Sequence, residues 1–367
     1  MQAPLITSII SGAVFGSGVI LPFAISRLSR TPSTSIKPNP LPAQPSLEVV
    51  IPAYLESGEI SGTVAAMQKQ LAYWPGPSSI TVVASDAETA HAATLADKVL
   101  SVGRLGKPAA CNTGVAGSNA DVVLLMDANC RVSPVDWPIR LAEHLENWSL
   151  VSANKREENG KESLFWRMEA SIKRSSSSRL GSLAVVGEFI AFRREDFRSI
   201  PSGIVLDDLW LALAFHRAGL PVTVAADIAT GEQAAAARDQ WERRVRINAA
   251  LLTESVPKVP WLLRSPEGRV YVAHKIYRVT IGVCAFWVCI VGVSLVFPPV
   301  TLPFVIAVIT LAVGQVAGFL KIRLPLSSFF SAVGLQAVPI AGAFRALSQR
   351  FRGPKNRSSN GWTKIAR

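Results

Sequence analysis

Two oxygen-bearing side chains follow a short apolar run in the middle of the chain. Residues 122–129 read VVLLMDAN, so five apolar residues lead directly into Asp127, and Asn129 comes two positions later. Such a run, β-branched at its start, is typical of an interior strand of a parallel sheet. Open α/β sheets bind ligands beyond the carboxyl ends of their strands, which makes Asp127 a candidate site residue. The alternative is an Asp that caps the next turn.

Two adjacent acids, Asp207 and Asp208, open the helical run DDLWLALAFHRAGL. Carboxylates at the start of a helix can accept hydrogen bonds from its unpaired N–H groups and meet the positive end of its dipole. Capping of this kind would explain one of the two acids.

A cationic group lies further along the chain in QWERRVRI. On a helix, its polar members fall within about half the circumference at ~100° per residue; they are Gln240, Arg243, Arg244 and Arg246. Arginines can stabilise negative charge that develops on a leaving group. The alternative is a solvated basic face.

Strands and helices alternate around these residues. Apolar runs at LEVVIPAY, SSITVVAS, KVLSV and DVVLLMDAN predict strands, and residues 58–72, 87–97 and a stretch from Lys107 predict helices. This alternation predicts an α/β fold with a mainly parallel sheet and helices on both faces. A helical stretch and a strand, AVVGEFIAFRR, are expected after residue 162. The chain lacks a P-loop, a GxSxG elbow, an HExxH pair and a GxGxxG turn, which excludes most common soluble enzyme classes.

The ends of the chain are too apolar for an ordinary soluble domain. Residues 5–25 carry no charge and are long enough to span a membrane, so residues 1–30 are predicted to be a transmembrane anchor. A cleaved signal peptide is the alternative, but no Lys or Arg precedes the run and no small-residue cleavage site follows it. The Pro- and Ser-rich residues 31–46 predict an extended linker, and residues 47–260 a globular domain.

The C-terminal part is predicted to return to the membrane. An interfacial segment is expected at 261–278 and a membrane region at 279–347, with spans at 279–297 and 302–320; residues 324–344 are a third span or a re-entrant segment, followed by a basic tail at 348–367. Lys and Arg flank the spans on one side, so the positive-inside rule predicts a multi-pass protein of the cell membrane with a cytoplasmic globular domain.

The formal net charge of +12 fits contact with membrane lipid head groups better than a nucleic-acid partner, which is not expected. The four cysteines lack metal-ligand spacing and predict reduced, structural thiols. The four histidines are scattered, which argues against a zinc site.

Seven motifs in register resemble membrane-bound family 2 glycosyltransferases of the GT-A fold, in particular the processive group similar to cellulose and hyaluronan synthases. They cover roughly residues 47–278 and read VVIPAYLES, GRLGKPAACNTGVAGSNADVVLLMDAN, FWRMEASIKRSSSSRLGS, VVGEFIAFRRE, VLDDLWLALAFHRAGLPV, DQWERRVRI and HKIYRV.

The resemblance implies roles for the polar residues. Asp127 and Asn129 would hold Mg²⁺ or Mn²⁺ under the diphosphate of a nucleotide sugar, although Asn129 departs from the Asp-x-Asp form of the motif. Asp208 would be the general base that takes a proton from the acceptor hydroxyl, and Asp207 would orient it. The processive members have a Gln-x-x-Arg-Trp motif that contacts the acceptor end and the diphosphate. The predicted helix carries the matching residues, with Arg244 in the place of Trp; they are Gln240, Arg243, Arg244 and Arg246.

The same resemblance implies which residues bind the nucleotide part of the donor. Pro52, Ala53, Tyr54 and Glu56 would form the loop under the base, and Asp86 would contact uridine. Lys107 and Asn112 would lie on the helix that faces the donor, with Lys107 on phosphate as a compact charge. A surface lysine is the equally weighted alternative for Lys107.

The expected function is inverting transfer of a sugar from a nucleotide sugar, with a UDP-sugar as the first expectation, to a glycan or lipid-linked acceptor in polysaccharide or glycoconjugate biosynthesis. The alternatives are a polyprenyl-phosphate glycosyltransferase and a catalytically silent partner of a polysaccharide assembly complex. A silent partner should have lost Asp127 or Asp208, and both are present.

Overall fold

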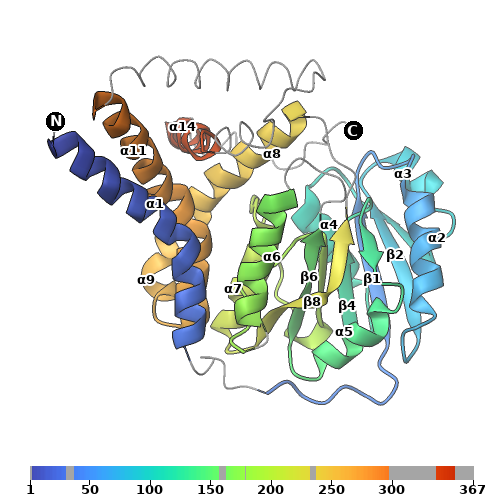
Figure 1. Cartoon of the computed structure of the whole chain (residues 1–367). Coiled ribbons are helices and arrows are strands. Elements are labelled where there is room, and N and C mark those ends of the chain that lie inside the picture. The colour runs from blue at the N-terminus through green and yellow to red at the C-terminus, as the bar shows by residue number, and fades with distance from the viewer. Residues whose placement is uncertain are drawn as a thin grey trace.

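A sheet with helices on its two faces forms the body of the molecule (Figure 1). The computed structural model describes residues 2–29, 37–156, 163–177, 179–231, 237–296 and 336–351. The first half of the domain contains β1 (Leu47–Ala53), α2 (Ile60–Leu71), β2 (Ser78–Ala84), α3 (Ala87–Ala92), β3 (Lys98–Ser101), α4 (Lys107–Ala116) and β4 (Val122–Met126). The second half contains β5 (Arg131–Ser133), α5 (Trp137–Leu145), β6 (Leu150–Arg156), α6 (Ser163–Ser177), β7 (Phe189–Arg193), α7 (Asp207–Arg217), β8 (Val222–Gly231) and α8 (Ala237–Ala250).

The eight strands form one sheet in the order β3-β2-β1-β4-β7-β6-β8-β5. The first four strands of this order are parallel, as the alternation of strands and helices predicts. The other half is mixed, because β7 is antiparallel to both β4 and β6, and β5 is antiparallel to β8, while β6 and β8 are parallel. The expectation of a mainly parallel sheet is therefore correct for the first half and wrong for the second.

The direction of β7 follows from the return segment after α6, residues 181–188. Near its start, the Ser182 N–H donates to the Val222 carbonyl at the beginning of β8 (2.9 Å). Further on, the Val186 N–H reaches the Ser152 hydroxyl in β6 (2.8 Å), and the Glu188 carbonyl accepts from the Asp127 N–H beyond the end of β4 (3.1 Å). The segment thus returns to the edge that holds Asp127 before β7 begins. From that edge β7 can only run antiparallel to β4.

The central strands are buried on both faces, which explains their unbroken apolar runs. Along β1, Val49 and Ile51 belong to the core under α2 and α5, where Trp137 is fully buried, whereas Val50 belongs to the core under α4 and α7. On the second face, Gly114 of α4 lies so close to β1 that an added Cβ would come 2.2 Å from Val50 Cγ1. This close approach fixes α4, and therefore its first residue, against the sheet.

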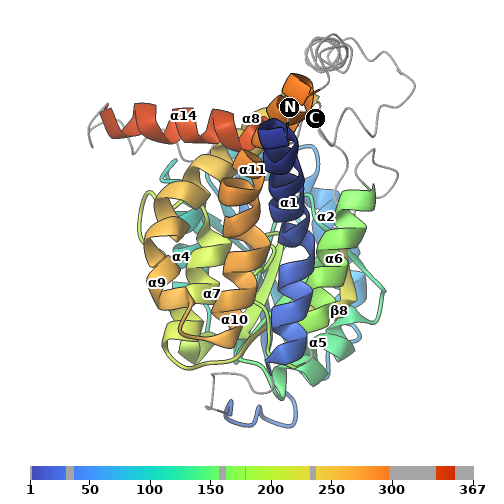
Figure 2. The same ribbon diagram turned by 60° about the vertical axis from the view of Figure 1, so that its left-hand side comes forward.

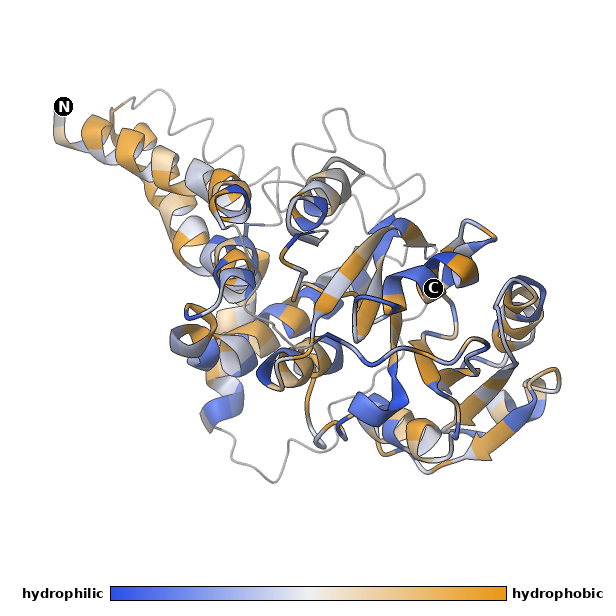
Figure 3. Ribbon diagram, turned by 90° about the horizontal axis from the view of Figure 1, so that it is seen from below, coloured by the Kyte–Doolittle hydropathy of each residue, from blue (hydrophilic) through white to orange (hydrophobic). Residues whose placement is uncertain are grey.

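Two long apolar helical runs pack together beside the sheet. The first is α1 (Gln2–Leu28), and the second continues from Pro266 to Val296 through α10 (Pro266–Tyr271), a π-helical stretch and α11 (Val283–Val296). Figures 1 and 2 show α1 and α11 side by side, and Figure 3 shows hydrophobic residues along their projecting ends. The helical run has no break at residue 278, where the sequence predicts the change from interfacial segment to span.

A further helix, α14 (Val338–Phe351), lies across α8. Val338 and Gly342 face inward, and the large side chains Ile340, Phe344 and Leu347 are exposed, Phe344 by 70%. The predicted span at 302–320 lies outside the described residues. Of the predicted segment 324–344, the described part turns at 336–337 and enters α14, which continues past residue 344 into basic residues.

The second apolar run is held to the sheet domain by a buried carboxylate. Glu169 on α6 is 2% exposed and accepts from His274 (3.1 Å), Lys275 (2.5 Å) and Arg278 (2.5 Å). Although burial alone would raise its pKa, Arg278, His274 and Lys275 hold the pKa of Glu169 well below its usual value. The HKIYRV motif therefore anchors the helix to α6. Cys111, Cys130, Cys284 and Cys289 form no disulfide bond with one another.

Glu169→Ala is expected to destabilise the protein by about 3–5 kcal/mol, because it takes the shared carboxylate away from the partly buried cations Lys275 and Arg278 and from the buried His274 ring. Thermal unfolding in detergent measures this change. The control is Glu146→Ala, which removes an exposed acid at the end of α5 and should change the midpoint little. Equal midpoints for the two variants would show that the cluster contributes no net stability.

Candidate active site

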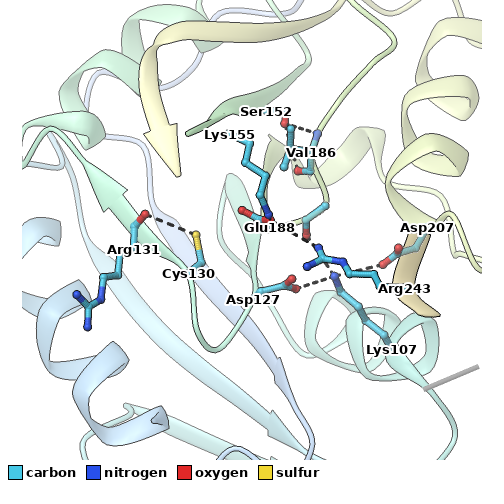
Figure 4. A network of polar contacts seen from close by, with 11 residues as sticks. Lys107, Asp127, Cys130, Arg131, Ser152, Lys155, Val186, Glu188, Asp207 and Arg243 are labelled. Atoms are coloured by element: carbon cyan, nitrogen blue, oxygen red, sulfur yellow. Dashed lines mark hydrogen bonds and ion pairs between the residues drawn. The ribbon is translucent and has the colours of Figure 1, made fainter. Parts of the chain in front are cut away.

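The polar residues that the sequence singles out gather at one edge of the sheet. Asp127 follows β4, Lys107 is the first residue of α4, Asp207 is the first residue of α7, and Glu188 directly precedes β7. The parallel strands β1, β2 and β3 each lead into a helix at this edge, whereas β4 leads into β5, and α7 begins here after the loop that follows β7. Figure 4 shows Lys107, Asp127, Glu188, Asp207 and Arg243 pointing toward one another.

Lys107 is at the centre of this group. Its Nζ lies 2.6 Å from Asp127 Oδ1 and 3.6 Å from Asp207 Oδ2, and it donates to the Gly187 carbonyl at 3.2 Å. Burial alone would lower the pKa of Lys107, but Asp127 and Asp207 raise it well above its ordinary value. The surface-lysine alternative is therefore wrong. Gly106, just before Lys107, has a φ of +92°, which only glycine adopts readily, and this turn starts the helix at Lys107.

Asp208 is buried at the start of α7, next to Gly187. A Cβ on Gly187 would lie 3.4 Å from the Asp208 Cβ, so the two residues are in contact. One Asp208 carboxylate oxygen accepts from the Leu209 N–H (2.7 Å). Burial and the neighbouring Asp207 raise the pKa of Asp208 to about 6, while Leu209, Lys107 and Lys173 act in the opposite direction. The carboxylate is thus poised to exchange a proton near neutral pH.

The N–H groups that precede α7 already have another acceptor. Glu254, which follows α8, accepts from the Val205 N–H (3.0 Å) and the Leu206 N–H (3.3 Å). At the helix start itself, Asp208 accepts from the Leu209 N–H, whereas Asp207 lies near Lys107. Capping therefore accounts for a contact of Asp208 and not for the position of Asp207.

Glu188 and Lys155 are site residues that the sequence interpretation missed. Glu188 is 2% exposed, is bonded to the Lys155 ammonium, and lies 3.7 Å from Arg243 Nη2. Its carbonyl accepts from the Asp127 N–H, so the same residue positions Asp127 and a cation of α8. The available signal was a single carboxylate inside the apolar run VVGEFIAF.

The basic residues of α8 are divided between the site and its surroundings. Arg243 faces Glu188, as described above, and Gln240 is half-buried one turn earlier. Burial lowers the pKa of Arg246, as do Arg243 and Arg345 of α14, while Asp207 acts in the opposite direction, so Arg246 lies near both arginines and near the site. Arg244 is half-buried, and its carbonyl accepts from the Asn248 amide (3.0 Å). A uniformly solvated basic face is therefore excluded.

The residues predicted to bind the nucleotide also lie close together, at the ends of β1 and β2. The Asp86 carboxylate accepts from the Leu55 N–H (2.7 Å) and the Thr89 N–H (2.8 Å), so it fixes the loop after β1 to the start of α3. Pro52 and Ala53 end β1, and Arg104 stacks on the Tyr54 ring at 4.9 Å. The Glu56 N–H donates to the Thr89 hydroxyl (2.9 Å). Asp86 thus already has a structural role in this loop.

Asn112 does not join the group. Its amide donates to the Ile200 carbonyl and accepts from the Ile200 N–H, both at 2.9 Å. The side chain therefore fixes the loop before α7, and we do not include it in the proposed donor site. Its position explains this difference, because five residues place it about 140° around α4 from Lys107.

The residues present fit a divalent cation that takes few ligands from the protein. Asp127 offers carboxylate oxygens, and Asn129 lies in the turn that follows, on the same edge. Within the described ranges, no group of three or more His, Cys, Asp or Glu side chains could hold a metal. An all-protein cage is therefore not formed by the described residues. The oxygen donors suit Mg²⁺ or Mn²⁺ bound mainly through water and substrate phosphates.

Comparison with known proteins identifies the domain. Residues 48–200 match the model of glycosyl transferase family 2. A mannosyltransferase from Pyrobaculum calidifontis, solved with GDP-Man and Mn²⁺, has a TM-score of 0.67 at 19% identity over 94% of this chain and 99% of its own. Glucosyl-3-phosphoglycerate synthase from Mycobacterium tuberculosis has a TM-score of 0.42 at 20% identity, over 61% of this chain and 86% of its own. A search of curated proteins found no match. Residues 48–200 therefore match glycosyl transferase family 2, the chain shares its fold with the mannosyltransferase, and these findings support a glycosyltransferase.

Proposed function

We propose that this enzyme transfers a sugar from a nucleotide sugar, a UDP-sugar in the first instance, to a glycan or lipid-linked acceptor at the cytoplasmic face of the cell membrane. The observation that carries the proposal is the meeting of Asp127, Lys107 and Asp208 at the carboxyl edge of the sheet. This edge offers a place for a metal, a cation for phosphate and a base. Those are the groups that displacement of a nucleoside diphosphate requires.

At the donor side, Asp127 and Asn129 would hold the divalent cation, which neutralises charge on the departing diphosphate. Lys107 and Arg243 supply further positive charge from α4 and α8, and both already lie against carboxylates of the site. Tyr54, Glu56 and Asp86 would border the base, in the loop that Asp86 holds in place. The buried Glu188 keeps Asp127 and Arg243 in register.

At the acceptor side, Asp208 would take the proton of the attacking hydroxyl. Its raised pKa of about 6 leaves the carboxylate ionised near neutral pH and yet basic enough to accept a proton. A single base of this kind is compatible with direct displacement and inversion at the anomeric carbon. Asp207 would orient the site through its contact with Lys107.

The acceptor can also be polyprenyl phosphate. Arg243 and Arg345 both lie near Arg246, so α8 and α14 bring several guanidinium groups to this side of the site. Anionic phosphate on a lipid carrier would match these cations. A catalytically silent role is disfavoured, because Asp127 and Asp208 are both present and come to one edge.

Membrane attachment is supported by the exposure of the two apolar runs. Ala3–Leu28 has 26 residues and Pro266–Val296 has 31, and their most apolar windows are only 22% and 33% buried. The core helix of a soluble protein would be mostly buried. Near its C-terminal end α1 also packs on the domain, where the Ser26 hydroxyl donates to the Ser175 carbonyl of α6 (2.6 Å). The catalytic domain, residues 47–260 in the proposal, would therefore be held close to the membrane surface.

Topology reporters test this arrangement. Fusions after Arg30 and after Lys321 are expected to report cytoplasm, and an insertion at Pro298 or Pro299 to report the outside, because basic residues flank the runs on the cytoplasmic side. A reporter that fluoresces only inside, paired with an enzyme active only outside, checks each position twice. Cytoplasmic signal from the Pro298 insertion would show that residues 279–320 do not form a membrane hairpin.

The proposed activity is tested by incubating the purified, detergent-solubilised protein with a panel of nucleotide sugars, with and without Mn²⁺. We expect slow hydrolysis of one donor, and this hydrolysis should require the metal. Absence of both hydrolysis and nucleoside diphosphate binding across the panel would reject the proposed donor site.

A further inference from the structure

Three oxygen atoms from three different elements surround the ammonium group of Lys107. They are Asp127 Oδ1 at 2.6 Å, the Gly187 carbonyl oxygen at 3.2 Å and Asp207 Oδ2 at 3.6 Å. The first follows β4, the second lies before β7 and the third starts α7. One cation therefore satisfies oxygens that the fold brings together from distant parts of the chain.

These oxygens are of the type that a hard divalent cation prefers. Carboxylate and carbonyl oxygens are the usual protein ligands of Mg²⁺ and of similar ions. A lysine ammonium is a compact point charge that can occupy such a position, and its four-carbon stem lets the charge move while the backbone stays fixed. The backbone of Lys107 is fixed by the start of α4 and by the packing of Gly114 on β1.

We infer that Lys107 is the resident counter-ion of Asp127 in the donor-free enzyme, and that it makes binding of the divalent cation depend on the nucleoside diphosphate. This inference rests on the proposed donor site. Without nucleotide, a divalent cation at Asp127 would lie beside the Lys107 charge, and the two cations would repel each other and compete for one carboxylate. A diphosphate removes that conflict, because its oxygens attract the ammonium away from Asp127.

The consequence is an ordered loading of the site. Asp127 is released for the metal only when an anion is present to take Lys107, so the metal and the nucleotide enter as a unit. Asp127 and Asp207 then have a positive charge nearby in both states, Lys107 before loading and the metal after it. The alternative is a plain structural ion pair between Lys107 and Asp127 that persists in every state. The nucleotide would then raise metal affinity only through its own phosphate ligands, and to the same extent in variants with a neutral residue 107.

Calorimetric titration of Mn²⁺ into the full-length protein in detergent separates these cases, with UDP and GDP as the nucleotide probes. The wild type is expected to bind Mn²⁺ weakly alone and at least about tenfold more tightly with the matching nucleotide. Lys107→Met removes the charge with little change in length, so its affinity for Mn²⁺ alone should rise by about tenfold or more. The enhancement by nucleotide should shrink accordingly.

Two control variants test whether the effect depends on the charge at residue 107. Lys98→Met removes the same charge from an exposed lysine whose Nζ donates to the Gly117 carbonyl at the far end of α4, and it should bind Mn²⁺ like the wild type. Lys107→Arg keeps the charge and should also bind Mn²⁺ weakly without nucleotide. Lys107→Gln serves as a second neutral variant if the Met variant does not fold.

Equal Mn²⁺ affinity of the wild type with and without nucleotide would overturn the inference, whatever the variants do. So would equal affinity of the wild type and the neutral Lys107 variants for Mn²⁺ alone. Failure of every protein to bind Mn²⁺ even with UDP or GDP is a different result. It would reject the metal-dependent donor site in the proposed function, and the inference with it.

Discussion

Asp208→Asn is expected to lower sugar transfer by about 10²- to 10⁴-fold while nucleotide affinity stays near that of the wild type. Asn keeps the shape of the side chain and can still accept the Leu209 N–H at the start of α7, but it cannot take a proton from the acceptor hydroxyl. If Asp208 only capped the helix, Asn would replace it at little cost, because both residues cap well. Initial rates with the donor found in the panel, together with calorimetry of the nucleotide, distinguish these roles.

The matched variant is Asp207→Asn, which should cost less because its carboxylate faces Lys107 rather than the acceptor. The pH profile adds a second readout. With a pKa of about 6, Asp208 is protonated and inactive as a base below that pH, so kcat/KM of the wild type should rise with pH through about 6. Asp208→Asn should lack this limb. Near-normal turnover by Asp208→Asn would reject the base assignment.

The first half of the sheet is readable from the sequence because its strands are buried on both faces. Runs such as VVLLM then carry no polar interruption, and their ends locate Asp127 directly. The direction of β7 is not readable in the same way. It depends on residues 181–188 returning to the edge that holds Asp127, and on hydrogen bonds to β6 and β8 that no local pattern encodes.

The site is readable where position along an element decides it. Lys107 is the first residue of the helix that follows the parallel strand β3, so it lies where helix starts meet strand ends at one edge of a parallel sheet. Asp207 is also the first residue of its helix, but a loop after the antiparallel β7 brings it to this edge. Where the face of a helix decides the matter, the sequence is insufficient. Asn112 turns toward Ile200, away from the cluster that holds Lys107.

Buried charges were the other omission. Glu188 is surrounded by apolar neighbours in the sequence. Its partner Lys155 lies 33 residues earlier, and its partner Arg243 lies on α8. A carboxylate inside an apolar run is a signal that such partners must exist, since an unpaired buried charge is very costly. Which cations fill that need is settled only by the tertiary structure.

Asp127→Ala is expected to abolish the gain in nucleoside diphosphate affinity that Mn²⁺ provides. Metal affinity should fall by more than about 100-fold, since replacing even an outer partner of a metal ligand typically lowers it by about 10- to 100-fold. Among the described residues, no cluster of acids could replace it as a ligand, and Asn129 offers only a neutral oxygen. The quantity to measure is the ratio of UDP or GDP affinity with and without Mn²⁺, by calorimetry.

The ratio matters more than either affinity, because the same substitution removes the nearest partner of Lys107, at 2.6 Å. An uncompensated ammonium attracts a diphosphate by itself, so metal-free binding of the nucleotide to Asp127→Ala should weaken little or become tighter. Asp136→Ala, which removes an exposed acid paired with Arg140, is the matched control and should keep the wild-type ratio. Metal-dependent affinity that is unchanged in Asp127→Ala would remove Asp127 from the donor site and leave its contact with Lys107 as a purely structural ion pair.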